Sequence, residues 1–162
     1  MLKIRSQTGA SMIEVLISLL IVAIGLLGQM TLQMTGVASN QSSYYRSQAS
    51  ILANEFVDKM RLNRDGVTNN IYDDISINTS STYTQPACYT NGCGFADQVL
   101  VDIYDVQETI KNSIPSGTVT VIRDPSITEQ AVFQITVSWQ LEDRAGLTNG
   151  NNVNRFVMDF GI

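Results

Sequence analysis

The chain has 162 residues, enough for one ordinary domain beside a membrane segment, because domains commonly run about 100 to 200 residues. Its 10 Lys and Arg residues against 15 Asp and Glu residues give a formal net charge of −5. This acidic balance disfavours nucleic-acid binding, which needs clustered basic side chains to neutralise phosphates. The sequence has no histidine, no glycine-rich phosphate loop and no nucleophile elbow, so we expect no enzyme, no cofactor and no metal site.

A nearly unbroken apolar stretch covers residues 10–30. About 20 apolar helical residues cross the hydrocarbon core of a bilayer, so this stretch is long enough to span a membrane. Lys3 and Arg5 precede it, and basic residues flank the cytoplasmic end of a membrane helix, so we expect residues 1–9 inside the cell and the rest outside. A secretory signal peptide has a shorter apolar core followed closely by a small-residue cleavage site, which makes conventional cleavage after Ala38 the weaker alternative.

Glu14 is the single acidic residue of this stretch. A charged side chain costs about 2.5 to 3.5 kcal/mol at the centre of a bilayer on insertion scales, and less near an interface. The carboxylate therefore needs either a cationic partner or a position at the interface from which it reaches water.

Residues 9–16, GASMIEVL, resemble the processing site of type IV prepilins. The resemblance implies that a prepilin peptidase cleaves between Gly9 and Ala10 and that the new amino group of Ala10 is methylated. It also implies an assembly role for Glu14, the fifth residue of the mature chain, whose carboxylate would meet the Ala10 amine of a neighbouring subunit.

The resemblance continues through residues 23–28 and 53–64, where the chain is similar to the minor pilins called PilV. It implies an α+β pilin fold with a long N-terminal helix, a short second helix and a small antiparallel β-sheet. The long helix would have a membrane-spanning first half and an amphipathic second half. The chain would then comprise a leader at 1–9, the transmembrane half of the long helix at 10–30 and a periplasmic domain at 31–162.

The same resemblance implies a function, which is that of a minor pilin incorporated at or near the tip of a type IV pilus to promote assembly. Assembly would support adhesion, twitching motility or DNA uptake. The partners would be the prepilin peptidase, other minor pilins, the major pilin and the pilus assembly platform of the inner membrane. The protein would cross the bacterial inner membrane once and become extracellular when assembled. Two alternatives stay open: a minor pseudopilin of a type II secretion system, and a signal-anchored periplasmic binding module that never polymerises.

One helix is predicted from about residue 10 to residue 62, because apolar positions continue at helical spacing and no proline interrupts them. At 1.5 Å per residue it would be about 80 Å long, too long for any bilayer. Its second half must therefore leave the membrane, and the apolar stripe of that half needs a soluble partner. Gly66 is predicted to end the helix with a left-handed cap.

Residues 67–90 are mostly polar and predict a long connecting loop. Cys88 and Cys93 lie in the part of the chain expected outside the cell, where disulfides persist, so we expect a disulfide between them. A redox or metal pair is the alternative, but the spacing is not Cys-x-x-Cys, and two ligands without a histidine do not make a zinc site.

A second helix is predicted over residues 96–113, where apolar residues recur at steps of four and three. Its acidic residues are interpreted as the solvent-facing side of this helix. They are Asp97, Asp102, Asp105 and Glu108.

Three strands are predicted around residues 118–121, 132–141 and 156–160, where apolar and polar residues alternate. Sequential antiparallel pairing is the economical topology. The apolar face of this sheet and the stripe of the long helix can cover one another. Tyr44, Tyr45 and Trp139 are interpreted as packing residues of that core.

Overall fold

The computed structural model describes residues 11–127, 130–140 and 153–162 of the chain. The chain divides into two compact units, which meet between residues 41 and 42. Helix α1, Met12–Leu62, contributes residues to both units. The predicted long helix is therefore confirmed over its described part, whereas residue Ala10 and the predicted leader, residues 1–9, lie outside the described residues.

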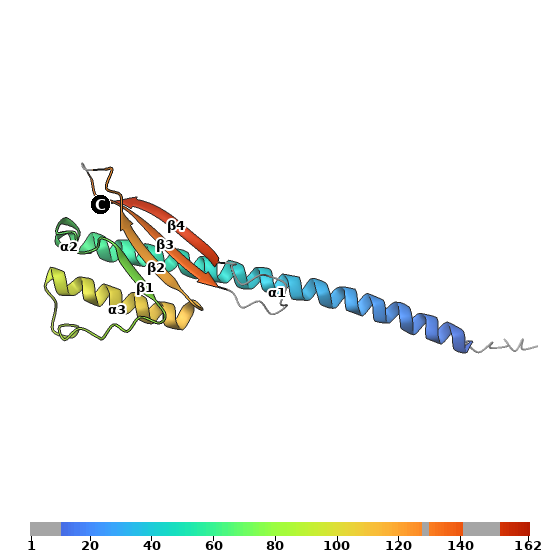
Figure 1. Ribbon diagram of the computed structural model, residues 1–162. Coiled ribbons are helices and arrows are strands. Elements are labelled where there is room, and N and C mark those ends of the chain that lie inside the picture. The colour runs from blue at the N-terminus through green and yellow to red at the C-terminus, as the bar shows by residue number, and fades with distance from the viewer. Residues whose placement is uncertain (1–10, 128–129, 141–152) are drawn as a thin grey trace, which may run out of the picture. The chain divides into compact units, whose positions relative to one another are not determined.

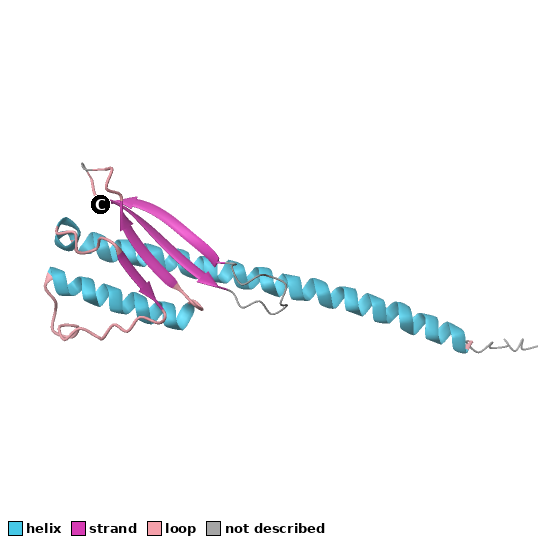
Figure 2. Cartoon of the chain, viewed as in Figure 1, coloured by secondary structure: helices cyan, strands magenta, loops and turns pink. Residues whose placement is uncertain are grey.

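The second unit contains two further helices and a four-stranded antiparallel sheet, which confirm the predicted α+β pilin fold (Figures 1 and 2). The strands follow one another in chain order across the sheet, so the predicted sequential pairing is also confirmed. The elements are α2 (Arg64–Thr68), β1 (Ile75–Asn78), α3 (Phe95–Ser113), β2 (Thr118–Arg123), β3 (Val132–Gln140) and β4 (Val153–Gly161).

One apolar core joins the sheet to the helices of the second unit. In β3, every second side chain is buried, and Ile135 lies opposite Val121 of β2 and Met158 of β4. The facing stripe of α1 includes Leu52 and Phe56, which are almost completely buried. Each element thus buries the apolar face that its own periodicity creates, as a helix-on-sheet layer requires.

The connection after α1 differs from the prediction in two respects. The polar segment 67–90 contains a four-residue strand, β1, which pairs with β2, so a continuous loop was the wrong prediction. The predicted left-handed cap at Gly66 is also wrong, because this glycine lies inside α2, while the side chain of Asn63 caps that short helix by accepting a hydrogen bond from the Gly66 N–H. Ile75 and Ile77 do alternate with Ser76 and Asn78, but this short pattern stands within a mostly polar segment, which the prediction took as a loop throughout.

The expected packing residues separate into buried and exposed ones. Trp139 is buried and Tyr45 packs against the core, as predicted. Tyr44 is 55% exposed, so the prediction is wrong for this residue. Adjacent helical positions point about 100° apart, and only one of the two tyrosines can face the sheet.

Candidate functional site

The first unit exposes an apolar helix surface. Along α1 from Met12 to Val37, the large apolar side chains are all more than half exposed. This helix is long and apolar enough to cross a membrane by length and composition. Such a surface is stable only when lipid or other apolar helices surround it, because exposed apolar area in water is unfavourable.

The hydroxyl groups within this part of α1 are satisfied inside the helix itself. Ser18 donates a hydrogen bond to the carbonyl of Glu14 at 2.7 Å. Thr31 donates to the carbonyl of Leu27 at 3.1 Å, and Thr35 donates to that of Thr31 at 3.0 Å. These bonds lower the cost of placing the hydroxyls in a medium without water, where unsatisfied polar groups are expensive.

The side chain of Glu14 lies in the first turn of α1 and is exposed. A carboxylate near a helix N-terminus is stabilised by the unpaired N–H groups there. Within the described part of the chain, no basic side chain lies within ion-pairing distance of it. The predicted cleavage residues, Gly9 and Ala10, lie outside the described residues.

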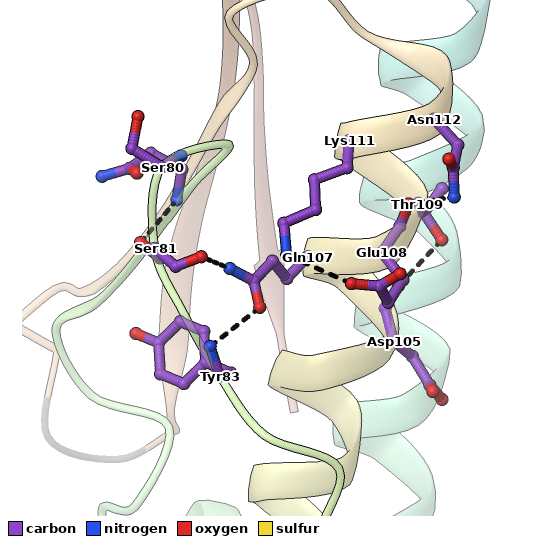
Figure 3. Close-up of polar contacts among 10 residues, drawn as sticks. Ser80, Ser81, Tyr83, Asp105, Gln107, Glu108, Thr109, Lys111 and Asn112 are labelled. Atoms are coloured by element: carbon purple, nitrogen blue, oxygen red, sulfur yellow. Dashed lines mark hydrogen bonds and ion pairs between the residues drawn. The ribbon is translucent and has the colours of Figure 1, made fainter.

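The predicted disulfide between Cys88 and Cys93 is confirmed, with the two Cα atoms 5.1 Å apart. It closes a small loop in the long segment between β1 and α3. The chain before this loop is held against α3 by Gln107, whose side chain accepts a hydrogen bond from the N–H of Tyr83 at 3.0 Å and donates one to the carbonyl of Ser81 (Figure 3). Gln107 is fully buried, and its amide supplies hydrogen-bond partners to the partly buried backbone of Ser81 and Tyr83.

An ion pair joins the last turns of α1 to the middle of α3. Lys59 Nζ lies 2.7 Å from Asp105 Oδ2, and the two side chains are 20% and 29% exposed. The hydroxyl of Tyr89 donates to the other oxygen of Asp105 at 3.1 Å. This hydrogen bond, together with the negative charge of Asp105, raises the pKa of Tyr89. Asp105 therefore holds the disulfide loop and α1 on the same side of α3.

A second polar network is buried in the second unit and is centred on Tyr72 and Asp102. Tyr72 donates its hydroxyl hydrogen to Asp102 Oδ2, and Gln98 Nε2 donates to Asp102 Oδ1 at 3.1 Å. Asn63 donates to the Tyr72 oxygen at 3.2 Å and to the carbonyl of Phe95 at 2.7 Å. Burial raises the pKa of Tyr72, and the hydrogen bond to Asp102 raises it further. The network links the end of α1, the segment before β1 and the start of α3.

Asp102 is a residue that the sequence interpretation placed wrongly. It was expected on the solvent-facing side of α3, but it is 2% exposed. Its spacing already indicated the buried face, because it lies three residues after Val99 and four before Val106, both of which are buried. Of the other acidic residues on α3, Asp97 is exposed, as expected, and Asp105 is half-buried in its ion pair.

The arrangement is suited to holding and presenting a surface. Among residues 11–127, 130–140 and 153–162, no three histidine, cysteine or acidic side chains are grouped so that they could hold a metal ion. The polar side chains described above are used to join elements to one another.

A family model described as Tt1218-like, Type IV pilin Tt1218, matches residues 31–104. The match includes the disulfide and the buried network around Tyr72 and Asp102, while the first 30 residues lie outside it. The comparisons with curated proteins and with solved structures found no match. Together with the long apolar helix, the match supports a type IV pilin-like protein.

Proposed function

We propose that this protein is a minor pilin similar to PilV, incorporated at or near the tip of a type IV pilus to promote assembly. The observation that carries the proposal is the exposed apolar part of α1, which begins three residues after Gly9 and contains one carboxylate, Glu14, at the spacing of the prepilin resemblance. The match to a type IV pilin family supports it. The role is structural, with adhesion, twitching motility or DNA uptake following from assembly.

Processing and register are two steps of the proposed mechanism. A prepilin peptidase cleaves between Gly9 and Ala10, and the new amino group of Ala10 is methylated. In the assembled filament, the Glu14 carboxylate of one subunit pairs with the Ala10 amine of the next. An unpaired charge in an apolar medium is expensive, so an offset that leaves both groups unpaired is disfavoured, and the pair sets the register of neighbouring helices.

The proposed localisation follows from the apolar segment at residues 10–30. Before assembly, residues 10–30 cross the inner membrane with Lys3 and Arg5 on the cytoplasmic side, and the second unit lies in the periplasm. The assembly platform and the other pilins meet the protein there. A disulfide between Cys88 and Cys93 agrees with an oxidising compartment such as the periplasm.

The first test is the mass of the amino-terminal peptide after co-expression with a prepilin peptidase. We expect a mature chain that starts at Ala10, with or without one methyl group. A Gly9→Val variant should keep its leader, because a branched side chain then stands where the proposed cleavage site has glycine, which has no side chain. An intact wild-type leader, or a chain that starts at Ser39, would remove the amine that Glu14 is proposed to meet and would overturn the mechanism.

The second test separates register from anchoring. Glu14→Gln removes the charge and keeps the length of the side chain, so the chain should still enter the membrane and be cleaved, but should be depleted from sheared pili. Ser18→Ala, one turn further along α1, is the matched control and should be incorporated normally. Restoration of protein secretion instead of piliation, in strains lacking the respective minor subunits, would favour the type II secretion alternative.

A further inference from the structure

A pocket that contains two arginines lies beside the short helix α2 in the second unit. Its volume is about 280 Å³, and it is open to solvent. Arg64 lines it from the first position of α2, and Arg123 lines it from the last position of β2. None of the side chains that line this pocket is acidic, although the formal net charge of the whole chain is −5.

The guanidinium group of Arg123 is held in place by its surroundings. Its Nη1 atom donates a hydrogen bond to the side-chain oxygen of Asn70 and lies 3.6 Å from Asp73 Oδ2. The guanidinium carbon lies 5.8 Å from the ring centre of Phe133. Because these contacts already fix the side chain, little further ordering of Arg123 is needed for it to bind a ligand.

Arg123 keeps hydrogen-bond donors that these contacts do not use. A guanidinium group carries five N–H donors, so three remain on Nε and Nη2. Neither atom bonds to a described residue, and both keep contact with solvent, since neither is buried without a partner. The N–H of Nε and one N–H of Nη2 point in the same direction, and this fork matches the two oxygens of a carboxylate.

Arg64 supplies a second cation that solvent can reach. Its side chain is exposed, and within the described part of the chain it forms no ion pair with any carboxylate, that of the main chain at Ile162 included. Asp73 pairs with Arg123 and leaves the charge of Arg64 without a described partner. The pocket therefore presents a positive charge and several free donors, and both favour an anion.

Two apolar residues complete the argument for the kind of anion. Ala131 and Ile162 also line the pocket, and both pack against the core. The N–H of Ile162 donates a hydrogen bond to the carbonyl of Ala131 at 2.9 Å, which holds the two segments together. An aliphatic stem can bury apolar surface against these residues, whereas an inorganic anion such as phosphate has no apolar surface to bury.

We infer that this pocket binds a carboxylate on a short aliphatic stem, the chemistry of a glutamate side chain. The Nε and Nη2 atoms of Arg123 donate to the two carboxylate oxygens, Arg64 adds the second positive charge, and the stem packs on Ala131 and Ile162. The inference depends on the pocket alone and not on the proposed pilus function. A free carboxylate and an acidic side chain of another subunit offer the same chemistry, so the source is tested separately.

Binding is tested on the full chain in micelles of an uncharged detergent at pH 7 and constant ionic strength. N-acetyl-glutamate methylamide is titrated while the amide signals of Thr68 and Ala131 are followed by NMR. N-acetyl-glutamine methylamide is the neutral probe of the same shape, and inorganic phosphate is the third probe. Arg64→Gln removes one cation from the pocket. Arg155→Gln is the matched control, because Arg155 is also exposed, forms no ion pair with a described residue and does not line the pocket.

We expect saturable shifts with the glutamate probe and at least tenfold weaker binding of the glutamine probe, a factor that corresponds to about 1.4 kcal/mol. Arg64→Gln should weaken binding of the glutamate probe by about tenfold, while Arg155→Gln should bind it like the wild type. Equal binding of the two probes, equal binding by Arg64→Gln and wild type, or no binding would overturn the inference. Tighter binding of phosphate than of the glutamate probe would overturn the preference for a carboxylate. Thermal unfolding confirms that each variant is folded, since both arginines are exposed.

The source of the carboxylate is tested in piliated cells. If it belongs to a neighbouring subunit, Arg64→Gln should be cleaved and inserted like the wild type but recovered in sheared pili at a several-fold lower level than Arg155→Gln. Equal recovery of the two variants would assign the pocket to a free carboxylate. If the wild-type protein never enters pili, the proposed function fails, and the probe titration still decides whether the pocket binds a carboxylate.

Discussion

Tyr72 donates its hydroxyl hydrogen to the carboxylate of Asp102 in the interior of the second unit, 30 residues away in the chain. Neither residue belongs to the apolar pattern from which the fold was predicted. The contact joins the segment before β1 to α3, and Asn63 extends it to the end of α1. A buried tyrosine and a buried carboxylate thus satisfy each other where three segments meet.

Tyr72→Phe should lower the free energy of unfolding by about 1 to 3 kcal/mol, because it leaves a buried carboxylate with one hydrogen-bond donor fewer. Tyr44→Phe is the matched control, since Tyr44 is 55% exposed, and it should change the free energy by less than about 0.5 kcal/mol. Denaturant unfolding of the detergent-solubilised full chain measures both. Equal stability of the two variants would mean that water replaces the tyrosine hydroxyl without cost.

Gly66→Ala should destabilise the protein although alanine is the better helix former. A Cβ atom at this position would lie 2.7 Å from Asn63 Nδ2 and 2.9 Å from Tyr72 Cε2. The amide that caps α2 must then move, and we expect a loss of about 1 to 3 kcal/mol, the usual cost of overpacking. Gly94→Ala is the control because nothing lies within 4 Å of its added Cβ. A stabilised Gly66→Ala variant would contradict the close packing of Asn63 on α2.

The Lys59–Asp105 pair should show a larger coupling energy than an exposed pair. Its side chains are 20% and 29% exposed, so we expect Lys59→Met and Asp105→Asn each to cost about 1 to 2 kcal/mol, between the values for surface and buried pairs. The double variant should cost clearly less than the sum of the two. The Lys111–Glu108 pair, at 34% and 45% exposed, serves as the control cycle and should couple by less than about 1 kcal/mol. Equal coupling in the two cycles would argue against a structural role for the α1–α3 pair.

The carboxyl group of Asp124 should titrate below its ordinary range. Its pKa is lowered because the side chain and the backbone N–H of Ser126 both donate hydrogen bonds to Asp124 Oδ1, at 2.6 Å and 2.9 Å. A lowered pKa in the folded state means that the charged form stabilises this turn above the unfolded pKa, and that the contribution is lost as the pH falls through the folded pKa. Ser126→Ala should raise the pKa of Asp124 toward its ordinary value, as carboxyl NMR titration would measure. Equal pKa values for Asp124 in the wild type and in Ser126→Ala would contradict a role for these two hydrogen bonds.

The sequence alone predicted the elements whose periodicity is long and regular. The helix through residues 12–62, the second helix to Ser113 and the strand at 132–140 all appear where their patterns indicated, within one or two residues. Each contains enough residues for one face to show a repeated apolar preference, and burial of that face is the main stabilising term. The disulfide partners could be named because the chain has only two cysteines.

The short elements and the polar interior were decided by the tertiary structure. Strand β1 has four residues and forms because β2 offers it an edge to pair with. Gly66 lies in a short helix because Asn63 caps it. Sequence patterns report which face of an element is apolar, but they do not report which distant polar group will arrive to satisfy a buried one.

The amino-terminal half of α1 therefore follows from the sequence by itself, since an unbroken apolar run of that length needs an apolar surrounding whatever the rest of the chain does. Glu14 can also be singled out from the sequence alone, because it is the single charged residue between residues 10 and 30. The hydrogen bond of Tyr72 with Asp102 and the ion pair of Asp105 with Lys59 were decided only by the tertiary structure. Each depends on a pairing between residues that are 30 or more positions apart in the chain, and no local pattern encodes such a pairing.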